Sequence, residues 1–296
     1  MIKKGIILAG GKGSRLNPIT SVINKHLIPV YDKPMIYYPL CTLMMANIRE
    51  ILLITNKRDI ELFCSLLGDG SQWGVSITYA VQEVPKGLVD AFIVGENFLN
   101  GDATALILGD NLFHGDGLIQ KLVGMSKINN GAKVLAYPVK DPERYGVVEF
   151  KSNGEVIDIV EKPSKPKSNY AITGLYFYDS TVVEKAKQVR PSMRGELEIT
   201  DLNKMYLDEN LLSVELMSRG MAWLDTGTFD SLYEASGYIR TLEMRQGFKV
   251  SCPEEVAFRK GWIDSKKLTF FAEKYKANFY GKYLNELMDD PLLNLS

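Results

Sequence analysis

Short, almost uninterrupted apolar runs constrain the fold of this chain more than any other feature. Ile6–Ala9 and Ala105–Leu108 contain no polar residue, which is typical of strands in a sheet that is covered on both faces. Longer segments with helical patterns separate such runs. Strands that alternate with helices in this way predict βαβ units and an α/β fold, with a mostly parallel, Rossmann-like sheet covered by helices.

The expected elements fall into three groups along the chain. In the first group we expect strands at Gly5–Ala9, Ile51–Thr55, Ser76–Gln82, Thr104–Leu108 and Lys133–Val139, and helices at Pro34–Asn47, Lys57–Leu67, Gly87–Leu99 and Gly117–Asn129. The second group has strands at Gly146–Phe150, Val156–Glu161, Ala171–Asp179, Leu212–Met217 and Ala222–Leu224, a hairpin turn at Ser152-Asn153-Gly154, and a helix at Glu196–Asp208. From Thr228 onward the sequence predicts helices, at Ser231–Arg245, Pro253–Lys260 and Lys266–Lys274.

The charge of the chain is almost balanced. Its 296 residues include 35 Lys and Arg against 36 Asp and Glu, a net charge of −1. A surface with this balance has no overall field that would hold a nucleic acid or an anionic membrane, so we expect neither partner. No apolar run approaches the roughly 18 residues of a membrane span, and the apolar stretch near Met1 is too short for a signal peptide. We therefore expect a cytoplasmic protein.

Few residues are available for binding a soft metal. Cys41, Cys64 and Cys252 are odd in number and far apart, which argues against a disulfide framework and against a thiolate zinc site. Two histidines, His26 and His114, are too few for a histidine-rich site. A metal ion would therefore be held by oxygen ligands, which points to magnesium or a similar hard ion.

A glycine-rich loop follows the first predicted strand. In Gly10-Gly11-Lys12-Gly13-Ser14-Arg15-Leu16, glycines let the backbone approach a ligand, and successive N–H groups can form an anion site. Lys12 and Arg15 add positive charge. The segment lacks the Walker A pattern, because Lys12 is followed by Gly13, and it lacks the dinucleotide fingerprint, because Leu16 replaces the third glycine. We favour a phosphate loop over a glycine-rich turn with solvated bases.

Two aspartates follow apolar strands far apart in the sequence. Asp110 ends Leu106–Asp110, and Asp225 follows Trp223-Leu224. Ligand sites of open α/β sheets collect at the carboxyl ends of the strands, where two carboxylates could share a magnesium ion. Taken separately, each aspartate suits a helix cap or a turn equally well.

Three further charged residues, Lys25, Glu161 and Lys162, would be interpreted as solvent-exposed surface residues if each were considered alone. Pro163 ends a strand and leaves Glu161 and Lys162 at its mouth, where a carboxylate could bind sugar hydroxyls and an ammonium a phosphate. By itself such a pair is usually solvated, as is a lysine such as Lys25.

Together, these motifs resemble the sugar-phosphate nucleotidyltransferases in order and spacing. The resemblance runs from about Lys4 to Tyr283 and is closest to the branch that uses dTTP and glucose 1-phosphate. The stretches that carry it are Gly10–Leu16, Lys25, Pro29–Leu40, Leu106–Asp110, Asp141–Phe150, Glu161–Pro163, Arg194–Asp201, Trp223–Thr228 and Ser251–Glu255.

This resemblance implies a reaction and a set of roles. dTTP and α-D-glucose 1-phosphate would give dTDP-glucose and pyrophosphate with Mg²⁺, as the first step of dTDP-rhamnose synthesis. The implied catalytic residues are Arg15, Lys25, Asp110, Lys162 and Asp225, with Asp110 and Asp225 as metal ligands. The implied nucleotide-binding residues are Leu8, Gly10, Gly11, Gly13, Ser14, Arg15, His26, Gln82, Gly87 and Asp110. The implied sugar-phosphate residues are Gly146, Glu161, Lys162, Ile172, Tyr176 and Trp223.

Several positions depart from the family's usual pattern. His26 stands where glutamine is usual, Ser14 replaces threonine, and Ile172 replaces valine. In the base-reading loop the differing positions are Glu83, Lys86, Val89 and Asp90. These changes leave the phosphate and metal groups intact, so they bear on nucleotide preference and turnover more than on reaction type.

The resemblance also implies how the chain is divided and assembled. Residues 1–227 would form the α/β core of the nucleotidyltransferase fold, with a nucleotide half to about residue 140 and a sugar-phosphate half from about residue 141. Residues 228–296 would form a helical region for assembly and regulation. We expect a homotetramer, with end-product inhibition by dTDP-rhamnose at a site near His114, Gly115 and Ser251–Arg259.

Three alternative functions stay open on the sequence. The altered loop at Glu83–Asp90 allows an enzyme that uses UTP or an amino-sugar 1-phosphate. A nucleotide-sugar-binding regulator without turnover is a second alternative, against which the intact charged residues argue. A glycosyltransferase is a third, but its nucleoside diphosphate donor has no leaving pyrophosphate for Arg15 to bind.

Overall fold

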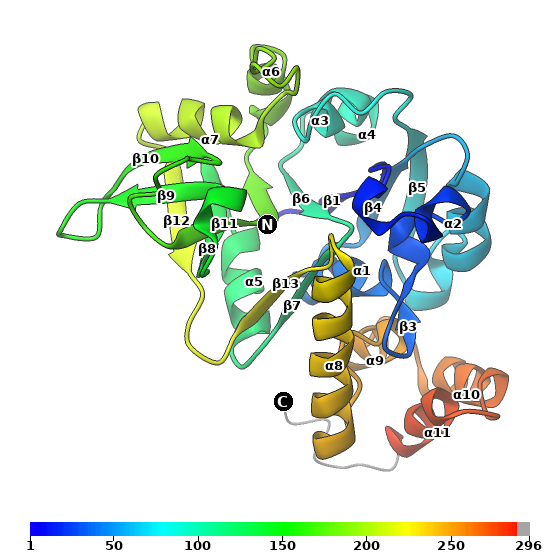
Figure 1. The fold of residues 1–296 in the computed structure, drawn as a ribbon. Coiled ribbons are helices and arrows are strands. Elements are labelled where there is room, and N and C mark those ends of the chain that lie inside the picture. Colours follow the sequence, from blue (N-terminus) through cyan, green and yellow to red (C-terminus); the bar gives the residue numbers. More distant parts are fainter. Residues whose placement is uncertain (289–296) are drawn as a thin grey trace.

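The computed structural model describes residues 1–288, and in this part of the chain the central sheet has nine strands. Its main path runs β10-β9-β11-β6-β1-β4-β5, while β8 pairs with β11 and β12 (Figure 1). These strands are β1 (Lys4–Leu8), β4 (Glu50–Thr55), β5 (Ser76–Val81), β6 (Thr104–Leu108), β8 (Ala132–Pro138), β9 (Gly146–Phe150), β10 (Val156–Glu161), β11 (Tyr170–Tyr178) and β12 (Leu212–Leu216).

The parallel part of the sheet brings distant loops to one edge. β1 lies between β4 and β6 in parallel register, with Leu8 opposite Ile54 and Leu108. β5 is parallel to β4. The segments that follow β1, β4, β5 and β6 therefore leave the sheet side by side, which is where α/β folds bind their ligands.

Helices cover both faces of the sheet and form two hydrophobic cores. Adjacent residues of one strand serve opposite cores: Ile7 packs on one face and Ile6 on the other, as the alternation of side chains along a strand requires. The first core lies under α1 (Tyr37–Met45), α2 (Ile60–Leu67) and α5 (Leu118–Ser126). The second lies under α3 (Asp90–Val94), α4 (Glu96–Leu99), α6 (Val182–Ala186) and α7 (Ile199–Asp208).

The sheet becomes antiparallel around β11. This strand pairs with β6, β8 and β9, and β9 forms a hairpin with β10. A separate two-stranded ribbon joins β7 (Asn111–His114) to β13 (Ala222–Asp225). The hairpin carries Glu161, and the ribbon carries Asp225 to the end of β6, so both elements position groups of the candidate site.

The structure confirms the predicted fold class and shows where the element predictions were wrong. The helix expected at Gly87–Leu99 is two short helices divided at Gly95, preceded by a loop. The helix expected from Pro34 begins at Tyr37, because Lys33–Pro34 is strand β3. β7 and α6 were not predicted, and α11 (Phe279–Glu286) was predicted only as part of the helical region after Thr228. The division at residues 227 and 228 stays a prediction, and its residues 289–296 lie outside the described part.

The segment after residue 228 is mainly helical. α8 (Phe229–Gln246) begins with a capping box in which Thr228 and Ser231 exchange hydrogen bonds, and it ends at Gly247 with φ 78°. It is followed by α9 (Pro253–Arg259), α10 (Ser265–Lys274) and α11. α9 packs against α1, so this segment is anchored on the core.

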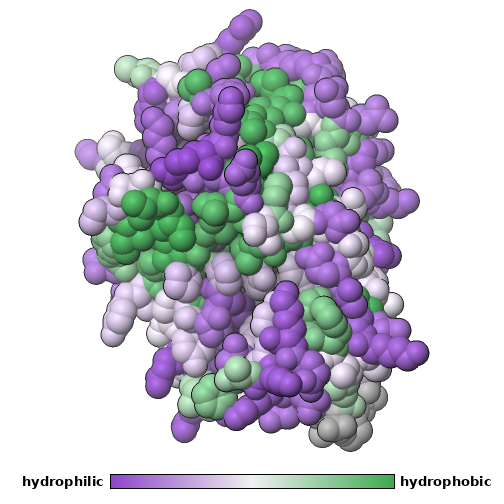
Figure 2. Space-filling view, turned by 90° about the vertical axis from the view of Figure 1, so that its right-hand side faces the viewer, coloured by the Kyte–Doolittle hydropathy of each residue, from purple (hydrophilic) through white to green (hydrophobic). Residues whose placement is uncertain are grey.

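The face that carries α2, β5, α10 and α11 is mostly hydrophilic, with separate apolar patches (Figure 2). Exposed apolar side chains of these helices include Leu62, Phe270 and Phe279. Among the described residues, no helix combines the length and the hydropathy that a membrane span requires.

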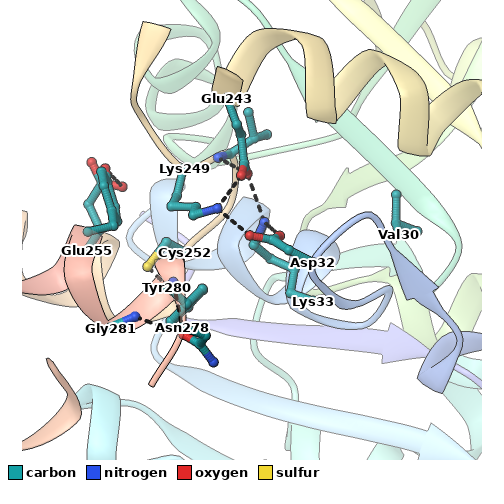
Figure 3. Close-up of polar contacts among 12 residues, drawn as sticks. Val30, Asp32, Lys33, Glu243, Lys249, Cys252, Glu255, Asn278, Tyr280 and Gly281 are labelled. Atoms are coloured by element: carbon teal, nitrogen blue, oxygen red, sulfur yellow. Dashed lines mark hydrogen bonds and ion pairs between the residues drawn. The ribbon is translucent and has the colours of Figure 1, made fainter. Parts of the chain in front are cut away.

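A cluster of four charges, of which Lys33 and Glu243 are buried, ties α8 to the hairpin of β2 (Pro29–Val30) and β3 (Lys33–Pro34) (Figure 3). The Lys33 ammonium lies 2.5 Å from Asp32 and 3.0 Å from Glu243, and Lys249 contacts the same two carboxylates. Glu243 also accepts a hydrogen bond from the Val250 backbone N–H at 2.9 Å. Burial would lower the pKa of Lys33, but the charges of Asp32 and Glu243 raise it, so Lys33 stays charged although it is buried.

Replacing Glu243 by Gln should lower the free energy of unfolding by about 3 kcal/mol, because a buried pair that loses one partner leaves an uncompensated charge. Urea denaturation at neutral pH measures the change. Glu234→Gln, on an exposed position of the same helix, is the control and should stay within about 0.5 kcal/mol of the parent chain. Equal stabilities of the two variants would contradict this account of the cluster.

Candidate active site

Two cavities adjoin at the carboxyl edge of the parallel strands. The smaller, about 230 Å³, lies beside the ends of β1, β5 and β6. The larger, about 470 Å³, lies between the end of β6 and the β9–β10 hairpin. Leu88, Leu108 and Asp110 line both cavities, so a ligand in one would meet a ligand in the other beside Asp110.

The glycine-rich loop leaves β1 and turns toward both cavities. Gly13 has φ 62°, a left-handed conformation that favours glycine, and a Cβ there would lie 2.9 Å from Thr20 Cγ2. The turn starts the short helix η1 (Ser14–Leu16). Gly11 lines the smaller cavity and Arg15 the larger. The loop is therefore able to hold a group that bridges the two cavities.

Lys25 and Asp110 form a largely buried ion pair at the junction of the cavities. Lys25 begins the short helix η3 (Lys25–Leu27), whereas Asp110 follows β6. Burial alone would raise the pKa of Asp110, but the Lys25 ammonium and neighbouring hydrogen bonds hold it well below its usual range. Asp110 is therefore a charged carboxylate at any physiological pH.

The β7–β13 ribbon brings Asp225 to Asp110. Asp225 lies opposite Asn111 in the register, and Thr226 donates to the Asp110 carbonyl from its N–H at 3.1 Å and its hydroxyl at 2.9 Å. Burial and the negative charge of Asp110 raise the pKa of Asp225. Two carboxylates that repel each other in this way fit a divalent cation between them.

The chemistry of this pair suits magnesium. Magnesium is commonly held by one or two carboxylates, with waters and phosphate oxygens completing its shell. Residues 1–288 contain no group of three or more His, Cys, Asp and Glu placed to bind a metal. A metal that needs a complete protein cage is therefore a poorer fit to the described residues than magnesium bound together with phosphate.

Glu161 and Lys162 lie at the opposite wall of the larger cavity, at the end of β10. Glu161 accepts a hydrogen bond from the Thr200 hydroxyl at 2.6 Å and lies 3.4 Å from Arg194. Lys162 has φ 42°, a left-handed backbone conformation that is uncommon for a residue with a side chain. A side chain at position 146 would crowd this wall, because a Cβ added to Gly146 would lie 2.9 Å from the Thr200 hydroxyl.

Asn111 connects the two aspartates to the larger cavity and was missed by the sequence analysis. Its amide donates to Asp110 at 3.0 Å, and its carbonyl accepts from the Trp223 indole at 2.5 Å and from the Gly174 N–H at 3.1 Å. The sequence could have pointed to Asn111 only through its position directly after Asp110, at the carboxyl end of a predicted strand. Other lining residues without a predicted role are Leu88, Leu108, Arg144, Tyr145, Gly174, Ile199 and Thr200 in the larger cavity, and Pro85 and Glu196 in the smaller.

His26 lines the smaller cavity in one fixed tautomer. The Asn24 amide donates to the Ala9 carbonyl at 3.3 Å and to Asp59 at 2.8 Å, so the Asn24 oxygen faces His26. That oxygen accepts from the His26 backbone N–H at 2.9 Å and lies 2.7 Å from Nδ1. Nδ1 is therefore the protonated nitrogen, and Nε2 is an acceptor. Burial, and next the Lys25 charge, lower the pKa of His26 to about 3.

The structure brings the predicted site residues together. Leu8, Gly11, Lys25, His26, Gln82, Gly87 and Asp110 line the smaller cavity. Arg15, Asp110, Gly146, Glu161, Lys162, Ile172, Tyr176, Trp223 and Asp225 line the larger. Gly10, Gly13 and Ser14 belong to the loop itself and do not line these two cavities.

Residues 4–241 match the family described as nucleotidyl transferase. The chain belongs to the nucleotidyl transferase family. A glucose-1-phosphate thymidylyltransferase of Xanthomonas campestris is 57% identical over 285 residues, which are 96% of this chain and 97% of that protein. The glucose-1-phosphate thymidylyltransferase of Mycobacterium tuberculosis is 55% identical over 286 residues, 97% of this chain and 99% of that protein.

Solved structures agree with the fold. A Bacillus anthracis protein assigned to glucose-1-phosphate thymidylyltransferase activity, in complex with sucrose, is 46% identical with a TM-score of 0.74, over 80% of this chain and 95% of that one. UDP-glucose pyrophosphorylase complexed with UDP-glucose is 27% identical with a TM-score of 0.70, over 81% of this chain and 99% of that one. The α/β sheet with its helical covering is therefore that of the family.

His26→Gln should make the stability of the chain less sensitive to acid. The unfolded chain binds a proton at this histidine below about pH 6.5, and the folded chain does so only near pH 3. Unfolding is therefore favoured as the pH falls through this window, by up to about 1.4 kcal/mol per pH unit from this group. Urea denaturation from pH 6.5 to about pH 5 should show a shallower loss for the variant. Above pH 7.5 the two slopes should agree, and identical slopes at all pH values would contradict the lowered pKa.

Proposed function

We propose that this chain transfers a thymidylyl group from dTTP to α-D-glucose 1-phosphate, giving dTDP-glucose and pyrophosphate. The observation that carries the proposal is that two cavities meet at Asp110. The phosphate loop lies beside the smaller cavity, and Gly146, Glu161 and Lys162 line the larger one. The thymidylyltransferases that are 57% and 55% identical over nearly the full length support the same choice of substrates.

The reaction needs positioning and positive charge more than a catalytic base. A sugar-phosphate oxygen attacks the α-phosphorus of dTTP, and the bond from that phosphorus to the β-phosphate oxygen breaks, releasing pyrophosphate. The attacking phosphate is already ionised near pH 7, because its second pKa is about 6. At about 4 Å and an effective dielectric constant of about 20, each pair of unit charges contributes about 4 kcal/mol of repulsion between the substrates.

Three cations of the chain offset this repulsion. Lys25, at the junction of the cavities, contacts phosphate oxygens at the reacting end. Arg15 lies in the larger cavity next to Gly227, since a Cβ on Gly227 would be 2.7 Å from its guanidinium, and it binds the leaving pyrophosphate. Lys162, at the opposite wall, holds the sugar phosphate. Asp110 and Asp225 would hold Mg²⁺, which would supply further charge stabilisation on the phosphates.

The walls of the two cavities select the substrates. Glu161 accepts hydrogen bonds from glucose hydroxyls while Thr200 fixes its carboxylate, and Gly146, Ile172, Tyr176 and Trp223 shape the space around the sugar. In the smaller cavity Gln82, Gly87 and His26 face the base and its sugar. Leu8 and the loop Gly10, Gly11, Gly13 and Ser14 lie along the nucleotide.

One alternative substrate has an observation in its favour. The likeness to UDP-glucose pyrophosphorylase and the altered loop at Glu83–Asp90 are compatible with UTP. Thymine and uracil present the same N3–H and O4 groups, so hydrogen bonding to this edge does not distinguish the two bases. A comparison of kcat/KM for the two nucleotides decides between them.

Purified protein with Mg²⁺, dTTP and glucose 1-phosphate should release pyrophosphate. Asp110→Asn should lower the rate at least about 100-fold, because it removes charge at the metal and at Lys25. Asp102→Asn, at an exposed ion pair with Lys4, is the control and should keep the parent rate. A preference for UTP or for N-acetylglucosamine 1-phosphate would change the assigned substrates. No pyrophosphate release with any combination of nucleotide and sugar phosphate would favour a non-catalytic regulator.

A third cavity is the candidate regulatory site. It measures about 500 Å³ and lies between the β7–α5 turn and the segment leading into α9. His114, Gly115, Ser251 and Arg259 line it. We propose that this chain acts as a homotetramer in dTDP-rhamnose synthesis and that dTDP-rhamnose binds here as the end-product inhibitor. The cavity lies outside the two substrate cavities, so inhibition would leave substrate contacts in place.

The double variant His114→Ala/Arg259→Ala should raise the dTDP-rhamnose concentration for half inhibition at least about tenfold, because a few lost polar contacts reduce binding by this much. Turnover without inhibitor should change little. Arg240→Ala, exposed on α8, is the control. Light scattering should show whether each variant keeps the parent's oligomeric state. Undiminished inhibition of an active double variant would remove this site from the proposal.

A further inference from the structure

A buried carboxylate lies behind the side chain that faces the base. Asp90, in the first turn of α3, accepts a hydrogen bond from the Gln82 side-chain amide at 2.8 Å. Gln82 is 4% exposed and Asp90 is 7% exposed. Gln82 follows β5, where its backbone N–H donates to the Thr55 carbonyl at 2.8 Å, so its main chain is fixed by the sheet and only its amide orientation is free.

Asp90 decides this orientation. A carboxylate accepts hydrogen bonds and does not donate them, so the NH₂ group of Gln82 must face Asp90. A rotated amide would place its oxygen against the carboxylate, with two acceptors in contact and a buried donor lost. The contact with Asp90 therefore turns the Gln82 carbonyl away from α3.

The Gln82 carbonyl is directed over the phosphate loop and is unpaired. A Cβ on Gly10 would lie 2.9 Å from Gln82 Oε1, so the glycine leaves this space open. None of residues 1–288 donates a hydrogen bond to Oε1, and this atom is not among their buried unsatisfied groups. Gln82 lines the smaller cavity. Because Asp90 fixes the orientation of the Gln82 amide, the group that Gln82 leaves for a ligand in the cavity is its carbonyl oxygen, a hydrogen-bond acceptor.

An acceptor beside a donor matches one class of pyrimidine. Thymine and uracil present N3–H as a donor next to O4 as an acceptor, which pair with the Gln82 oxygen and with its second N–H. Cytosine presents the reverse, an acceptor at N3 next to a donor at the 4-amino group. Reading cytosine requires the rotated amide, which Asp90 opposes.

We propose that Asp90 is a positioning residue that gives this site its preference for thymine or uracil nucleotides over cytosine nucleotides. The inference rests on the proposed function, in which the smaller cavity holds the base. Asp90 acts through Gln82 rather than by touching the nucleotide, and it raises selectivity chiefly by opposing the wrong base, as specific sites often do.

The test compares kcat/KM for dTTP, UTP and dCTP in the parent chain, Asp90→Asn and Asp90→Ser, with pyrophosphate release as the readout. Both replacements can donate as well as accept, so they tolerate either orientation of the Gln82 amide. The ratio of kcat/KM for dTTP to that for dCTP should fall at least about tenfold in both variants. The ratio for dTTP to UTP should stay unchanged, because these bases share the same edge.

Asp179→Asn is the matched control. Asp179 is also buried, but it accepts from the Gly131 N–H at 2.6 Å and from Thr181 and lines neither substrate cavity. This variant should lose thermal stability and keep the parent's base selectivity. A purely structural role of Asp90 would produce the same result at position 90.

The outcomes separate the inference from the function on which it rests. Turnover of the parent chain with dTTP and glucose 1-phosphate tests the function, whatever the variants do. Asp90 variants that lose dTTP and dCTP turnover in equal proportion would overturn the inference. Failure of both variants to fold would assign Asp90 to stability alone and would also overturn it.

Discussion

The ion pair between Lys25 and Asp110 is the interaction on which the rest of the site depends. It joins the segment after the glycine-rich loop to the end of β6, at the point that both cavities share. A largely buried pair of this kind is stable only while each charge keeps a partner. Substrate phosphates give Lys25 a second anion, and Asp225 places a second carboxylate beside Asp110. The pair thus holds opposite charges where two anionic substrates must meet.

The charge cluster of Asp32, Lys33, Glu243 and Lys249 connects the same segment to the C-terminal helices. Lys249 lines the third cavity and contacts Asp32. From the hairpin, backbone hydrogen bonds run from Met35 to Ile28 at 3.0 Å and from Ile36 to His26 at 2.9 Å. These ion pairs, the chain of the hairpin and the two backbone hydrogen bonds together link the third cavity to the residue beside Lys25. Any shift of residues 249–252 has to keep the buried Lys33 and Glu243 paired.

Sequence patterns predicted the parts of the fold that depend on apolar periodicity. The apolar runs Ile6–Ala9 and Ala105–Leu108 correctly predicted parallel strands. The glycine-rich loop and Asp110, which follow these strands, were therefore correctly expected at the same edge of the sheet. The approach of Asp225 required the β7–β13 ribbon, whose first strand, Asn111–His114, is too short to show a pattern. The tautomer of His26 depends on Asn24 and Asp59, which are near it only in the folded chain. Long-range polar contacts of this kind leave no periodic signal.

Two buried aspartates behind the smaller cavity set its polarity. Asp59 orients Asn24, which holds a proton on His26 Nδ1 and leaves Nε2 as an acceptor. Asp90 orients Gln82, which leaves its carbonyl as an acceptor. Both aspartates act through an uncharged amide, and the acidic side chains that line the cavity itself are Asp110, which is paired with Lys25, and Glu196. Lys25 lines the same cavity, whereas Arg15 and Lys162 line the larger one. Charge attraction and base recognition thus depend on different residues, although Lys25 and Gln82 line the same cavity.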